Sequence, residues 1–312
     1  MYKLIFINII FLLLISKDVL SQSWKKYRYE FSYGIGASNF NGDAGAVKNN
    51  TLLSDYIWFS PSSWRPVFQI GLAYKLKPRI NVKLDLTSGW LSADDRYGDW
   101  AARNLQFRAL IIEPSLNIEF YVVKEKKRKN IRRYGKIMKR KFQNFNLPTY
   151  FFAGVGGLYF NPKGKYKNGT WYALQPLGTE GQGIDGRDNP YSRFALSFPF
   201  GMGIKYSINN RMLIGIEAGM RYALTDYLDD VGGTYYDTQE IRDYHTDEPD
   251  IADYFSRKHA YYPNDTEQGS IVNGNGNPKG GEFIDAYQFL TFTVTYKLKT
   301  ARNGLPRFRI SY

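Results

Sequence analysis

The chain has 312 residues and a net charge of +13, with 43% hydrophobic and 17% aromatic side chains and no cysteine. Its mean hydropathy is −0.44. Beyond the N-terminal region, no run approaches the roughly 20 apolar residues that a membrane-spanning helix needs. The lack of cysteine excludes disulfides and a lipid anchor on an N-terminal cysteine. The composition leaves a soluble protein or a β-barrel that crosses a membrane with its strands.

Residues 1–21 have the features of a signal peptide. Lys3 supplies the positive start, residues 4–15 are almost wholly apolar but too short for a spanning helix, and a plausible cleavage position lies ahead of Gln22. A helical membrane anchor is the alternative interpretation. We expect an exported chain in which residues 22–312 form one domain.

Alternation of apolar and polar residues is the main signal along the chain. Between residues 27 and 40, Tyr, Phe, Ile and Ala alternate with Arg, Glu, Ser and Gly, and residues 79–90 and 290–298 repeat the pattern. Strict alternation is typical of strands with one apolar face. Five more segments fit the same pattern: 64–76, 105–123, 148–160, 191–207 and 211–224. The sequence thus predicts eight strands.

Two of these segments contain irregular features. The alternation in 105–123 changes phase near Ala109 to Ile111, which predicts a β-bulge there. Pro114 and Pro199 lie inside predicted strands, where a closed ladder disfavours proline because it lacks the N–H donor.

Strand length and connection length favour a barrel over a sandwich. The segments are longer than the usual 5 or 6 residues of a globular strand, and their polar faces mix charged residues with glycine, as small barrels do. Connections at 77–78 and 209–210 are tight, whereas four others are long: 41–63, 92–104, 161–190 and 225–283. Short inner turns and long external loops predict an all-β fold, an eight-stranded antiparallel transmembrane β-barrel of the cell outer membrane.

The connection after the fourth strand is long and strongly basic. From Lys124 to Lys141 it has eleven lysines and arginines and one acid, Glu125, which is a net charge of +10. Its apolar residues at 131, 134, 138, 142 and 145 form one stripe of a helix. A solvated positive hairpin is the alternative. By topology the segment faces the periplasm, so anionic lipid or an acidic protein is the expected partner, and export argues against nucleic acid. The candidate partner-binding residues are Lys126, Lys127, Arg128, Arg132 and Arg133.

The sequence shows no pattern that we would assign to catalysis. His245 and His259, the two histidines, lie among acids of the 225–283 connection, but their spacing matches no metal-ligand pattern. We expect no catalytic, metal or cofactor site. The lumen of an eight-stranded barrel is filled by side chains, which also argues against a general diffusion pore.

In the stretch from Thr225 to Asp237, Asp226, Asp229 and Asp230 directly follow the seventh strand and a Gly-Gly pair comes next. This composition predicts a turn that caps the strand at the outer rim, with Tyr227, Tyr235 and Tyr236 packed together.

Residues 27 to 300 resemble the outer-membrane barrel component of the type IX secretion and gliding machinery, the PorG-like family. The resemblance rests on four stretches: YGIGASNF at 33–40 with Gly42-Asp43, LQPLGTEGQG at 174–183, TDYLDDV at 225–231 with Thr234-Tyr235, and GNPK at 276–279. It implies an eight-stranded barrel that contacts a periplasmic ring made of a lipoprotein and its partner. The basic fourth connection does not match the family pattern.

Three hypotheses about function follow. The first is a non-catalytic barrel that anchors or helps assemble a secretion machine through periplasmic contacts, with outer-membrane lipid and the ring proteins as partners. The second is a surface enzyme or ligand-binding barrel that uses the 225–283 connection. The third is a narrow channel.

Overall fold

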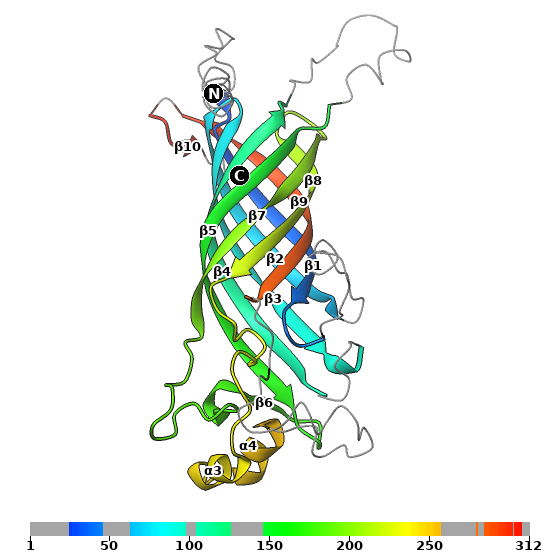
Figure 1. The fold of residues 1–312 in the computed structure, drawn as a ribbon. Helices are drawn as coiled ribbons and strands as arrows, with labels where there is room; N and C mark the ends of the chain where they lie inside the picture. Colours follow the sequence, from blue (N-terminus) through cyan, green and yellow to red (C-terminus); the bar gives the residue numbers. More distant parts are fainter. Residues whose placement is uncertain are drawn as a thin grey trace, which may run out of the picture.

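The computed structural model describes residues 25–45, 63–97, 104–125, 146–256, 279, 284–301 and 303–307. In these residues the chain forms a ring of eight antiparallel strands, each paired with its neighbours in chain order, and β1 closes the ring against β9 (Figure 1). The strands of the ring are β1 (Tyr29–Asn41), β2 (Arg65–Lys77), β3 (Ile80–Asp94), β4 (Gln106–Val123), β5 (Thr149–Lys165), β7 (Phe194–Ser207), β8 (Met212–Ala223) and β9 (Ala286–Thr300). The predicted barrel and its strand count are confirmed.

The alternation sorts side chains onto two faces of the ring because successive residues of a strand point to opposite sides. On β1, Tyr33 and Ile35 are 58% and 59% exposed, whereas Glu30 and Ser38 are buried. The other strands repeat this arrangement, with large apolar side chains outside and polar ones inside. The exterior is thus apolar and the lumen polar, which is the distribution that a barrel in lipid requires.

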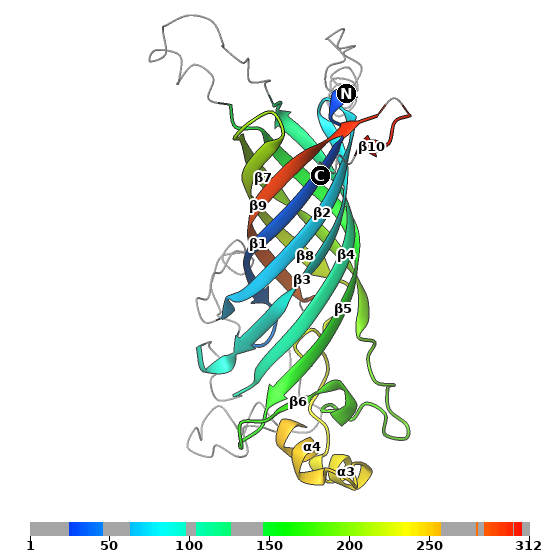
Figure 2. The same cartoon turned by 180° about the vertical axis from the view of Figure 1, so that it is seen from behind.

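The two ends of the barrel differ in their connections. At one end, which we call the inner end, tight turns join β2 to β3 and β7 to β8, and β1 begins beside the end of β9 with Tyr29 opposite Leu298. Apart from the connection between β4 and β5, the long connections leave the opposite, outer end (Figures 1 and 2). The connection between β4 and β5 is at the inner end, as the sequence predicted. Its residues 126–145 lie outside the described residues.

Strands β3, β4 and β5 continue past the others at the outer end (Figures 1 and 2). The short strand β6 (Trp171–Ala173) pairs with the end of β5. Two helices, α3 (Thr238–Tyr244) and α4 (Pro249–Ser256), lie in the connection between β8 and β9, and β10 (Pro306–Arg307) pairs with β9 at the inner end. Among the described residues, no helix has the length and apolar character needed to cross a membrane.

The bulge predicted near Ala109 to Ile111 is wrong. These residues pair without interruption with both β3 and β5, and the register shifts of β4 lie instead between Tyr121 and Val123. Phe107, Ala109 and Ile111 point inward in phase with Glu113. At this height the inward-facing side chains of β4 change from polar to apolar, so both faces of the strand are apolar. The alternation in the sequence is therefore lost although the strand itself is regular.

Both prolines lie where the ladder with β5 is interrupted. Pro114 pairs with Leu86 of β3, but the β4–β5 pairing skips from Ile112 to Ser115. Pro199 pairs with Arg221 of β8, but the β5–β7 pairing omits Pro199 and continues only at Ser197 and Phe200 on either side of it. The missing N–H donors therefore fall at positions where β5 offers no paired partner, which makes proline tolerable inside the barrel.

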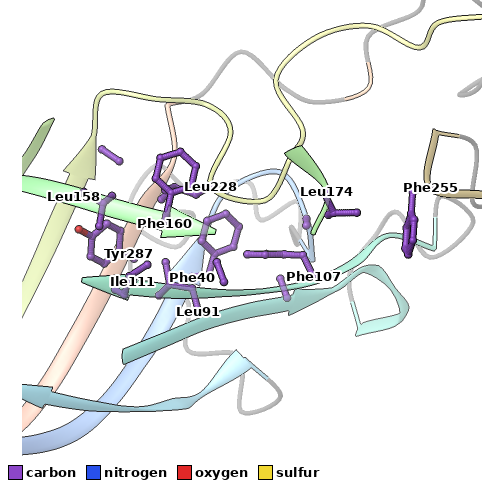
Figure 3. Packing of buried hydrophobic residues seen from close by; sticks show 14 of the residues in the cluster. Phe40, Leu91, Phe107, Ile111, Leu158, Phe160, Leu174, Leu228, Phe255 and Tyr287 are labelled. Carbon is purple, nitrogen blue, oxygen red and sulfur yellow. The ribbon is translucent and has the colours of Figure 1, made fainter. Parts of the chain in front are cut away.

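An apolar core fills the barrel at its outer end (Figure 3). Buried side chains of the strands meet buried side chains of the outer connections and of α4, including Leu228 and Phe255. Gly164 permits this contact, because a Cβ there would lie 2.5 Å from the ring of Phe255. The strand residues of this core are Phe40, Val67, Leu91, Ala93, Phe107, Ala109, Ile111, Leu158, Phe160, Ala223, Tyr287 and Phe289.

Candidate functional site: a closed barrel with a basic inner rim

The centre of the lumen is occupied by a buried ionic cluster around Lys83. Its Nζ atom lies 3.1 Å from Asp85 Oδ1 and 3.1 Å from Glu217 Oε2. Glu217 also accepts hydrogen bonds from Tyr150 Oη at 2.7 Å and Gln69 Nε2 at 3.2 Å. Buried charges are tolerated when they are paired and hydrogen-bonded, as these are.

A second cluster lies closer to the inner end, around Lys205. This lysine lies 3.7 Å from Glu119 and 3.8 Å from Glu30, and it donates to the Tyr121 hydroxyl at 2.9 Å. Its ammonium group also lies 4.6 Å from the ring centre of Tyr150, within the range of a cation–π contact. Because the side chains from opposite walls meet here, the space across the lumen is filled.

Toward the outer end, Arg221 and Glu113 form the last ion pair below the apolar core. Their closest atoms, Arg221 Nε and Glu113 Oε1, lie 3.4 Å apart, and Tyr287 donates its hydroxyl proton to Glu113. The Arg221 guanidinium stacks 4.0 Å from the ring centre of Phe289, a core residue. The polar lumen thus continues directly into the apolar core.

The outer connections are tied together by a buried lysine, Lys279. Its Nζ atom lies 3.3 Å from Glu180 Oε1, and it donates to Thr179 Oγ1 at 2.8 Å and to the backbone carbonyl of Asp230 at 3.1 Å. Asp230 in turn accepts from Thr179 and Tyr191, both at 2.6 Å. Burial raises the pKa of Glu180 to about 7 even though Lys279 opposes that rise.

Other carboxyl groups at the outer end also have raised pKa values. Asp285 is fully buried, and one of its oxygens accepts the backbone N–H of Leu228 at 2.8 Å. Burial raises its pKa well above the usual range, and neighbouring Asp229 adds to the rise. Burial and the nearby Asp43 raise the pKa of Asp226 to about 6. Within the described part of the chain, no group of three or more acids and histidines is arranged to hold a metal ion.

The Asp-rich stretch after β8 forms a rim turn, and two of its three tyrosines, Tyr227 and Tyr236, contact residues of another outer connection. Tyr227 stacks on Tyr191 with ring centres 4.5 Å apart. A Cβ on Gly181 would touch the ring of Tyr236, and Arg187 stacks on that ring at 4.2 Å. The turn therefore joins two outer connections.

His245 ends helix α3, where its backbone N–H donates to the Ile241 carbonyl at 3.1 Å. His259 lies outside the described residues. Neither helix of this connection was expected from the sequence. The missed signal is Asp237 followed three residues later by Glu240, because Asp237 caps the helix by accepting from the backbone N–H groups of Gln239 and Glu240.

The inner end carries a ring of exposed positive charge, which we call the inner basic rim. Of the described residues at this end, the acidic ones are Glu30, Glu119 and Glu125, and each lies within 4.0 Å of a lysine. The side chains of the rim are exposed to solvent. They are Lys25, Lys26, Lys77, Arg79, Arg211 and Arg307.

Glu125 joins the start of the basic connection to the barrel. It pairs with Lys297 of β9, and Ser207 of β7 donates to it at 3.0 Å. The predicted partner-binding residues follow directly, but they lie outside the described residues. These residues are Lys126, Lys127, Arg128, Arg132 and Arg133.

A ring of strands with an apolar outer face, a polar lumen, short inner turns and long outer connections has the geometry of a lipid-embedded bacterial barrel. The chain is an outer-membrane β-barrel. Its inner end therefore faces the periplasm and its outer connections face the exterior.

Comparison with solved structures gives outer-membrane barrels. Neisserial surface protein A is 8% identical, with a TM-score of 0.36, and the match covers 86% of this chain and 96% of that one. The attachment invasion locus protein of Yersinia pestis, solved with the heparin analogue sucrose octasulfate, is 10% identical over 87% of this chain and 99% of its own, with a TM-score of 0.36. OprG from Pseudomonas aeruginosa is 7% identical over 88% and 98%, with a TM-score of 0.32. No protein-family model and no curated protein sequence matches the chain.

Proposed function

We propose that the protein is a non-catalytic outer-membrane barrel that anchors or helps assemble a protein-secretion machine of the type IX kind through contacts in the periplasm. The observation that carries the proposal is the inner basic rim, an exposed positive surface continuous with the start of the basic connection. The four sequence stretches shared with the PorG-like family supply the kind of machine. The partners are then outer-membrane lipid and the periplasmic ring proteins, a lipoprotein and its partner.

The distribution of charge supports a role at the inner end. In the lumen, Lys83 and Lys205 are bound to carboxylates, and at the outer end Lys279 is bound to Glu180. At the inner end, by contrast, the side chains of the rim are exposed. The sequence that follows from Lys124 to Lys141 contains eleven basic residues and one acid. A positive surface of this kind attracts an acidic protein surface or anionic headgroups over about a Debye length of 8 Å at physiological salt.

The test is charge reversal at the inner end. One variant changes Lys126, Lys127, Arg128, Arg132 and Arg133 to Glu, and a second changes Lys77, Arg79 and Arg211 to Glu. The matched control changes Lys165, Lys167 and Arg187 to Glu at the outer end. Partner recovery after mild cross-linking in native membranes, together with secretion, is measured for each.

We expect the inner-end variants to fold, because the lumen and the apolar belt are untouched, but to lose most of their recovered partners and secretion. Raising the salt concentration should weaken the wild-type complex, since exposed charges are screened. The control should behave as wild type. Normal partner recovery and secretion by both inner-end variants would contradict the proposal and leave the segment as a solvated connection.

A further inference from the structure

A cavity of about 350 Å³ opens at the outer end of β3 and β4. Three arginines line it, Arg65, Arg96 and Arg108, with Asp94 as the acidic member of the wall. Asp94 binds Arg96 through Oδ2, which lies 2.6 Å from Arg96 Nη2. Trp171 of β6 completes the lining on one side.

The register of the strands gives the height of this cavity. Trp90 and Leu110 are cross-strand partners on the lipid-facing side and are 40% and 37% exposed. The next pair on that side of the ladder toward the exterior is Ser92, which is buried, with Arg108, which is exposed. Two residues of a strand span about 7 Å. The exterior therefore changes from apolar to basic within one step of the ladder, at the boundary where tryptophan commonly marks the membrane interface.

Arg108 is held in position for binding an anion. Its guanidinium lies 4.1 Å from the ring centre of Trp171, which fixes the plane of the guanidinium by stacking. On the neighbouring strand β5, Lys163 is the cross-strand partner of Arg108 and places a second positively charged residue beside it. A stacked guanidinium keeps its N–H groups at the edge, where a phosphate or sulfate can accept two of them.

We propose that this cavity binds the phosphate or sulfate group of an anionic saccharide at the outer surface of the membrane. The size suits one sugar residue with its charged substituent, since ligand pockets for small molecules begin near 300 Å³. Two sources provide this chemistry: the phosphorylated headgroup of a glycolipid in the outer leaflet, and a free phosphorylated saccharide. A cavity directly above the apolar belt is accessible to both the glycolipid headgroup and the free saccharide.

The experiment uses the full-length folded barrel. In the lipid arm, the barrel is placed in phosphatidylcholine nanodiscs containing bisphosphorylated lipid A, and retained lipid A is counted by native mass spectrometry. In the soluble arm, glucose 1,6-bisphosphate is titrated by calorimetry. The variants are R108A and R108K, and the matched control is R187A, another arginine stacked on an aromatic ring, Tyr236, away from the cavity. Folding of each variant is checked by its heat-modified gel mobility.

Wild type and R187A should bind each probe with the same affinity. R108A should bind at least about tenfold more weakly, as expected for the loss of a bidentate charge-assisted hydrogen bond. R108K should fall between them because it keeps the charge but not the planar fork. Binding in the lipid arm alone identifies the glycolipid, and binding in the soluble arm identifies the free saccharide. The proposal is refuted if the wild-type barrel binds neither probe, or if R108A binds a probe as tightly as the wild type does.

Discussion

Replacing Lys83 tests whether the charged side chains of the lumen are paired with one another and shielded from water. Lys83 has 6% side-chain exposure and lies 3.1 Å from both Asp85 and Glu217. Replacing it with methionine leaves two buried carboxylates without their cation. Loss of one partner from a buried ion pair costs about 3–5 kcal/mol. Glu217 keeps its bonds from Tyr150 and Gln69, and Asp85 keeps one from Asn117 at 3.0 Å. We therefore expect the lower end, about 3 kcal/mol.

The free energy of unfolding is measured by urea titration of the barrel in lipid vesicles, followed by tryptophan fluorescence. The double variant K83M/D85N should recover part of the loss, because it removes one uncompensated charge. As a control, R242M removes exposed ion pairs to Asp250 and Asp253 on the outer helices and should leave the unfolding midpoint unchanged. A loss below about 1 kcal/mol for K83M, or no recovery in the double variant, would refute the reasoning, since water in the lumen would then be solvating the acids.

Three further predictions follow from the interior and the outer connections. Gly203→Ala should cost about 1–3 kcal/mol in the same titration because its Cβ would lie 2.2 Å from the Tyr150 ring, whereas Gly157→Ala, with open space around it, should be neutral. The pKa of Glu180 rises from 4.5 to about 7 on folding, so its contribution to stability is full below pH 4.5 and is lost as pH rises toward 7. Rate-corrected hydrogen exchange of residues 174–183 should therefore be slower at pH 5 than at pH 8, and Glu180→Gln should reduce that difference; an unchanged difference would exclude this residue as its cause. Because lumen and outer end are filled, planar-bilayer recordings should show no steady nanosiemens openings, and such openings would contradict the packing.

Part of this structure follows directly from the sequence. Alternation of period two, as in residues 27–40 and 290–298, depends only on the geometry of a strand, so it predicted eight strands and the side each residue faces. Connection lengths predicted which end carries the long loops, because a tight turn such as 77–78 needs only local sequence. The basic connection could likewise be assigned to the inner end by counting strands.

Other features depend on contacts between residues far apart in the chain. Lys83 and Glu217, or Thr179 and Lys279, meet only because the ring closes and the outer connections fold over it. The same closure changes the interior from polar to apolar along β4, so Ala109 and Ile111 looked like a bulge in the sequence although their pairing is regular. The arginine cavity depends on the register that aligns Arg108 with Ser92 and on the stacking of Trp171, and neither has a local signature. Local periodicity determined which face of the barrel each residue takes, whereas ring closure decided which residues meet, because side-chain partners across a sheet are set by strand register.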